Sequence, residues 1–130
     1  MSSLSDTAAV IASVGVAGLA VFQFLLALGL PYGHAAFGGA NSVLPAKLRF
    51  ASALSSIIFL LAFYVVLARG DAVGGEERYA LVTIGIWAFA ALFAVSALAN
   101  VASHSRWERY LMAPIGVVLT VCCAVLAVKP

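Results

Sequence analysis

The chain has 130 residues, of which 65% are hydrophobic and 9% are charged, and its mean hydropathy is +1.13. Soluble domains contain about 45–50% apolar and about 25% charged residues, so this composition excludes a soluble globular protein and predicts an integral membrane protein. The net charge of +2 is small and gives no reason to expect nucleic acid as a partner.

Four apolar runs are each long enough to cross the roughly 30 Å hydrocarbon core of a bilayer, which takes about 20 helical residues. None shows the alternating pattern of a membrane β-strand, so the sequence predicts an all-α fold. We expect one membrane domain over residues 1–130, a polytopic protein with four transmembrane helices in an up-down bundle. The expected helices cover residues about 8–30, 48–68, 79–101 and 106–128.

The first run follows Ser5, Asp6 and Thr7, which are good N-cap residues. We therefore expect the first helix to begin just after them. Pro31 cannot continue a regular helix, so it is expected to end this one.

The segment between the first two runs, residues 31–45 (PYGHAAFGGANSVLP), contains no Asp, Glu, Lys or Arg. Its glycines and prolines exclude a continuous helix, whereas its apolar side chains distinguish it from an ordinary aqueous loop. The sequence predicts a compact apolar cap, rich in Gly and Pro, at one end of the bundle. Pro45 suits the first turn of the second helix, with Asn41 or Ser42 as a nearby cap.

The connection over residues 69–78 is polar, with three carboxylates: Asp71, Glu76 and Glu77. Gly70 is expected to end the second helix in the left-handed conformation, and the acidic residues favour the start of the third. We interpret this connection as a solvated turn.

The last connection, ASHSRWERYLMAP (residues 102–114), contains Ser105 and Glu108 at the spacing of a capping box. Glu108 is therefore interpreted as a helix cap rather than a catalytic acid. Pro114 would leave one carbonyl without a partner, so the sequence predicts either a kink or a separate interfacial turn over residues 106–113.

Polar residues within the runs are few and uncharged. No Asp, Glu, Lys or Arg lies in the central two-thirds of any run, which argues against a pump built on a buried carboxylate. Ser96, Asn100 and His104 recur every four residues and would share one face of a continuing helix. Gln23, on the first helix, is expected at a depth in the membrane comparable to that of Asn100 and toward the same membrane face. These side chains either hydrogen-bond between helices or form a polar pocket at one membrane face.

In the pocket hypothesis, polar side chains of the helices line the bottom of the pocket, the 31–45 segment covers it, and basic residues lie at its edge. Its candidate ligand-binding residues are Gln23, His34, Asn41, Arg49, Ser96, Asn100 and His104. No catalytic residue can be assigned. Neither a metal nor another cofactor is expected, because the two histidines lack a third ligand and adjacent Cys122 and Cys123 point about 100° apart.

Orientation follows from the basic residues. The side of the cap carries four (Lys47, Arg49, Arg106 and Arg109), and the other side carries three (Arg69, Arg78 and Lys129). The positive-inside rule therefore favours both termini outside.

Two segments also carry a resemblance to known proteins. The pair LPYGHAAFGG…LPAKLR and ALANVASHSRWERYLMAP resembles landmarks of small bacterial four-helix integral membrane proteins of unassigned function. The resemblance implies the four-span architecture and suggests that the face with these segments matters, but it implies no activity. We expect the protein in the bacterial inner membrane.

Three functions stay open. The favoured one is a noncatalytic membrane component that binds a lipid or a membrane protein partner through the polar pocket. Because four short helices enclose little space, the second is a transporter or channel subunit acting as a homo-oligomer. The third is an integral membrane enzyme acting on a lipid head group, with His34 or His104 as acid–base group and Arg49 as anion-binding group.

Overall fold

The computed structural model of the chain describes residues 3–70 and 79–129. Within these ranges it is all-helical, as predicted, and has no strand. The long helices are α1 (Ser3–Ala27), α2 (Ala46–Arg69), α3 (Tyr79–Val101) and α4 (Ala113–Val128). The π-helical turn η4 (Glu108–Met112) leads into α4, and two short 3-10 helices, η1 (Gly33–Ala35) and η2 (Phe37–Gly39), lie between α1 and α2.

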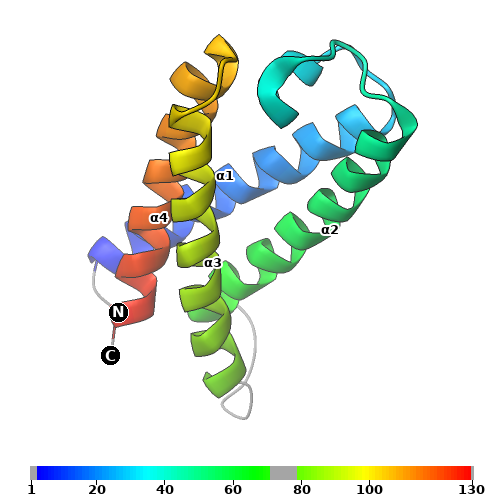
Figure 1. Ribbon diagram of the computed structural model, residues 1–130. Coiled ribbons are helices and arrows are strands. Elements are labelled where there is room, and N and C mark those ends of the chain that lie inside the picture. Colours follow the sequence, from blue (N-terminus) through cyan, green and yellow to red (C-terminus); the bar gives the residue numbers. More distant parts are fainter. Residues whose placement is uncertain (1–2, 71–78, 130) are drawn as a thin grey trace.

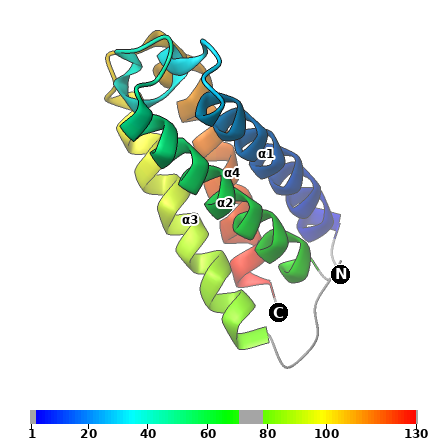
Figure 2. The same cartoon turned by 90° about the vertical axis from the view of Figure 1, so that its right-hand side faces the viewer.

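In the part of the chain that the structure describes, four helical stretches of 21 to 25 residues are long and apolar enough to cross a membrane, with η4 and α4 forming the last of them. This confirms that the fold is compatible with an integral membrane protein. Helices α1 and α2 form one hairpin, and α3 and α4 form a second (Figure 1). The hairpins are close together near the two termini and diverge toward the other end, where the 31–45 segment lies between them (Figure 1). Figure 2 shows this segment at the end of the bundle remote from the termini.

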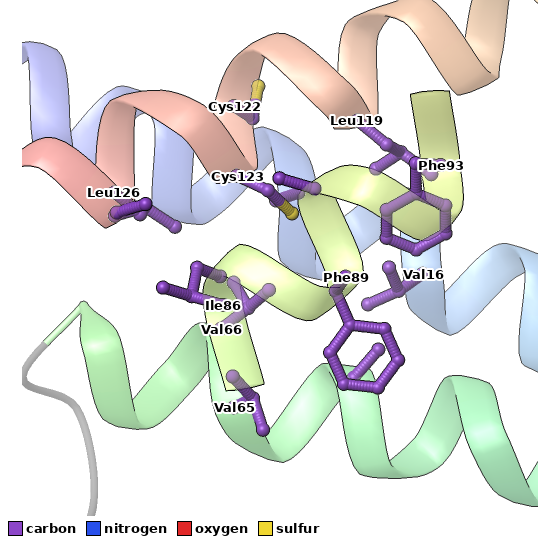
Figure 3. Packing of buried hydrophobic residues seen from close by; sticks show 14 of the residues in the cluster. Val16, Val65, Val66, Ile86, Phe89, Phe93, Leu119, Cys122, Cys123 and Leu126 are labelled. Atoms are coloured by element: carbon purple, nitrogen blue, oxygen red, sulfur yellow. The ribbon is translucent and has the colours of Figure 1, made fainter. Parts of the chain in front are cut away.

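The main core lies between the two hairpins (Figure 3). All four long helices contribute to it, and its fully buried side chains include Val16, Val66, Ile86, Leu119 and Leu126. Close approach of α3 to α4 depends on a small residue, because a Cβ added to Gly116 would lie 3.1 Å from the Cβ of Ala97. Membrane helices associate mainly by such van der Waals packing.

Helix α1 lies several residues nearer the N-terminus than the predicted range of 8–30. It begins at Ser3, so the expected N-cap residues lie inside it, and Thr7 donates its hydroxyl to the Ser3 carbonyl. Its end is set by Gly29, which has a φ of +94°. The amides of Gly29 and Leu30 donate to the carbonyls of Leu26 and Leu25 (3.0 and 3.2 Å), which is the Schellman pattern. Pro31 comes only after this stop.

Substituting Gly29 with alanine is expected to lower the free energy of unfolding by about 1–2 kcal/mol. The new Cβ would be strained at this φ and would lie 3.3 Å from the guanidinium carbon of Arg49. Thermal unfolding in mild detergent measures the effect. Gly18→Ala is the control, because a Cβ there meets nothing within 4 Å and alanine favours a helix. Equal stability of the two variants would contradict this account of the helix end.

The ends of α2 also differ from their predicted caps. Pro45 itself is the N-cap residue and no side chain caps the first turn, so neither Asn41 nor Ser42 has the predicted capping role. Gly70 has a φ of −82°, which is not left-handed. The predicted turn with Asp71, Glu76 and Glu77 lies outside the described residues.

The connection from α3 to α4 combines a partial cap with the π-helical turn. Ser105 Oγ accepts a hydrogen bond from the Glu108 amide (3.3 Å), which is one half of the predicted capping box. The Glu108 carboxylate instead accepts from the Ser103 hydroxyl. The amide of Ala113 donates to the Glu108 carbonyl, five residues back. This wider turn comes just before Pro114, which has no amide hydrogen to donate.

Candidate functional site

A cavity of about 260 Å³ lies between the two hairpins, beside the 31–45 segment. We call it the inter-helix cavity. All four helical stretches line it, as do Ala35, Ala36 and Phe37. Its polar lining residues are Gln23, Ser55, Ser96, Asn100 and Glu108. Three of the residues predicted to form a pocket, Gln23, Ser96 and Asn100, are thus brought together.

On every helical stretch that lines the cavity, a polar residue lies nearer the 31–45 segment than an apolar one does. On α1, Gln23 lies nearer the 31–45 segment than Leu19, and on α2 Ser55 lies nearer than Phe59. The other two stretches follow the same order, with Asn100 before Phe93 and Glu108 before Ile115. These pairs are separated by roughly 6 to 10 Å along their helices. We call the end nearer the 31–45 segment the polar end, because the polar lining residues lie toward it beside Phe22 and Phe37, and the opposite end is apolar.

Gln23 brings an unused hydrogen-bond acceptor to the cavity. Its amide oxygen Oε1 is buried and has no partner within the described ranges. A buried polar atom without a partner costs about 1–3 kcal/mol. A ligand with a donor at this position would recover that cost.

Glu108 is the charged residue of the cavity, and its side chain is only 8% exposed. Ser103 donates its hydroxyl to Glu108 Oε1 at 2.5 Å. The sequence predicts Glu108 as a helix cap, and Glu108 is not among the residues predicted to line the pocket. A usable signal was present, because Glu108, Met112, Ile115 and Gly116 have the i, i+4, i+7, i+8 spacing of one helix face, and all four line the cavity.

The other four predicted site residues do not line the cavity. Asn41 is half-buried within the 31–45 segment, and Arg49 donates from Nε to the Ala27 carbonyl at the end of α1. His104 is exposed and lies beyond the last residue of α3, so the predicted stripe ends at Asn100. His34 is exposed, donates from Nδ1 to the Gly39 carbonyl (3.0 Å) and lines a separate outer groove with Tyr32.

The 31–45 segment is folded onto itself and onto its neighbours. The Gly33 amide donates to the Ser42 carbonyl at 2.8 Å, so the two halves of the segment cross there. Ala36 and Leu44 are buried against Leu26 of α1 in a small second core.

A further contact joins this segment to the α3–α4 connection. The Ser105 hydroxyl donates to the His34 carbonyl. Gly39 is close by, because a Cβ added there would lie 2.7 Å from the Ser105 Cβ. The segment is therefore held from both hairpins at the polar end of the cavity.

The chemistry that this arrangement offers is recognition by hydrogen bonds, one carboxylate and aromatic rings. Four phenylalanines line the cavity: Phe22, Phe37, Phe59 and Phe93. No group of three His, Cys, Asp or Glu side chains that could hold a metal is found in the part of the chain that the structure describes. Cys122 and Cys123 are free and buried in α4 within the main core.

Comparisons with known protein families, with characterised proteins and with solved structures find no match to this chain. The resemblance to small bacterial four-helix membrane proteins therefore stays a prediction.

Proposed function

We propose that this protein is a noncatalytic component of the bacterial inner membrane that binds a small amphipathic molecule, such as a lipid, in the inter-helix cavity. The observation that supports this proposal is the shared gradient of polarity along all four helical stretches. A molecule with a polar group and an apolar tail satisfies both ends of such a cavity at once.

The proposed membrane arrangement places the four helices up and down across the bilayer, with the 31–45 segment as a cap over one end. The polar end of the cavity would then lie near that membrane face, where a polar head group costs least to bury. The cap side carries four Lys and Arg residues against three on the other side, so it would face the cytoplasm, with both termini outside.

The size of the cavity limits the ligand. Its volume of about 260 Å³ is near the lower end of the range of about 300–1,000 Å³ for small-molecule sites. It therefore suits a small amphipathic molecule, or the polar end of a single-chain lipid, better than a whole phospholipid.

Replacing Gln23 or Asn100 with leucine is expected to weaken ligand binding about tenfold, because each change removes a polar group from the polar end of the cavity. Native mass spectrometry of the full chain, released from mild detergent after incubation with single-chain lipids, measures the retained fraction. Thr7→Ala is the control, since Thr7 is exposed and bonds only within its own helix. Equal retention by all variants would indicate that Gln23 and Asn100 serve only to hold the helices together.

The same spectra address the two alternatives. A transporter or channel subunit requires an oligomer, which the mass reports directly. The enzyme alternative requires His34 or His104 beside its substrate, and neither residue lines the cavity. Binding of a lipid or a partner therefore has the better support.

A further inference from the structure

We propose that the ligand of the inter-helix cavity carries an ammonium group, bound between the Glu108 carboxylate and the Gln23 amide oxygen, and an apolar tail that lies against the phenylalanine rings. This inference rests on the proposed function and names the chemical class of its ligand. The ammonium group can belong to a free amphipathic amine or to the head group of an ethanolamine lipid.

The first observation is the charge of Glu108, which no basic side chain balances within the described ranges. No Lys or Arg lines the cavity. The nearest arginine in the sequence, Arg109, is engaged elsewhere, since its Nη1 donates to the Ser103 carbonyl (3.0 Å) and its guanidinium lies 5.4 Å from the centre of the Tyr110 ring. A buried carboxylate without a cationic partner is unfavourable, and a bound cation would remove that penalty.

The second observation is that Glu108 is held in place by neighbouring hydrogen bonds. Ser103 Oγ accepts from the Ser105 amide at 3.0 Å and donates its own proton to Glu108 Oε1. One neutral hydroxyl orients the carboxylate without neutralising its charge. The group is therefore positioned in advance for a ligand with positive charge.

The third observation concerns hydrogen-bond donors. An ammonium group offers several donors and no acceptor. Gln23 Oε1 is a buried acceptor that has no donor within the described ranges, and Glu108 offers acceptors as well. A carboxylate or phosphate ligand would place acceptor against acceptor here. The donor pattern thus selects a cation over an anion, and a primary ammonium over a hydroxyl with its single donor.

The fourth observation is the aromatic lining. Phe59 and Phe93 stack with ring centres 6.1 Å apart and planes 10° apart, and both line the apolar part of the cavity. Phe37 lines the cavity from the 31–45 segment. Ring faces attract cations and accept apolar tails equally well, so an amine with an aryl or alkyl tail matches both ends of the cavity.

The test uses the full chain in neutral maltoside detergent and three probes of one shape: phenethylamine, phenethyl alcohol and phenylacetate. The expected result is that the amine binds the wild type at least about tenfold tighter than the alcohol, and that phenylacetate does not bind. Glu108→Gln should abolish this preference. Asp6→Asn removes an exposed carboxylate from the other end of α1 and should leave it intact. Isothermal calorimetry gives the affinities.

Two lysolipids, one with an ethanolamine and one with a glycerol head group, identify the source of the ammonium. Preference for the ethanolamine lipid without binding of phenethylamine assigns the cation to a lipid head group and supports the proposal.

If all probes bind equally and Glu108→Gln changes nothing, the cation inference fails while the proposed function stands. If neither the probes nor the lysolipids bind, the proposed function fails as well. If the Glu108→Gln variant does not fold, the preference of the wild type for the amine over the alcohol still decides whether the cavity selects a cation.

Discussion

Replacing Arg69 with leucine is expected to lower the free energy of unfolding by about 3–5 kcal/mol. Arg69 is at the end of α2, is 3% exposed, and reaches the end of α4. Its Nε donates to the Leu126 carbonyl at 2.8 Å, and its Nη2 donates to the carbonyls of Ala127 and Lys129 at 3.3 and 2.7 Å. The last carbonyls of a helix have no partner within it and carry the negative end of its dipole. Leucine would fill the space without bonding any of these oxygens.

Chemical unfolding in mixed micelles measures the loss for Arg69→Leu, and hydrogen exchange locates it. Exchange should rise first over the last turn of α4. The control is Arg106→Leu, because Arg106 is exposed in the α3–α4 connection, and its effect is expected to stay within about 0.5 kcal/mol. Similar losses for the two variants would mean that the arginine hydrogen bonds at the end of α4 contribute little.

Three arginines share this arrangement at helix ends. Arg49 bonds the last residue of α1, Arg69 bonds the end of α4, and Arg109 bonds the carbonyl of Ser103, two residues beyond α3. From the sequence alone, Arg49 is predicted to bind an anion at the edge of the pocket. The first two contacts join residues 22 and 57 positions apart, so local patterns could not predict them. They depend on which helix ends meet in the folded chain.

What the sequence did predict follows from local physical rules. Length and apolarity identify a membrane-spanning helix without knowledge of its neighbours, and the four stretches are found close to their predicted ranges. The four-residue spacing predicts Ser96 and Asn100 on one face and the depth along the first helix predicts Gln23 at the same level, and all three line the inter-helix cavity. The same spacing failed for His104 because α3 ends at Val101.

The residues that were missed are those whose position depends on backbone geometry or on a second segment. Gly29 stops α1 through a positive φ, a role that the nearby Pro31 concealed in the sequence. Glu108 was explained by its capping spacing, and this hid its place on the cavity face of η4 and α4. A polar residue with one adequate local explanation can still serve a site that forms only in the folded chain.

Gly33→Ala is expected to open the 31–45 segment and to cost about 3 kcal/mol or more. A Cβ at Gly33 would lie 2.1 Å from the Asn41 carbonyl oxygen and 2.7 Å from that of Ser42. Both are backbone atoms, so no side-chain rotation relieves the contact. The two halves of the segment would have to separate, and the hydrogen bond from the Gly33 amide to the Ser42 carbonyl would break. Leu44 would then lose its burial against α1.

Hydrogen exchange over residues 31–45, together with ligand binding, tests this effect of Gly33→Ala. Protection of the segment should fall at least about tenfold while that of the main core stays unchanged, because no residue of the segment belongs to that core. Ligand affinity should fall with it, since Phe37 and its neighbours line the cavity from this segment. Gly38→Ala is the matched control, because a Cβ there strains a φ of +79° but meets nothing within 4 Å. If both variants keep the protection and affinity of the wild type, the crossing at Gly33 does not hold the segment over the cavity. The cavity would then depend on the four helices alone.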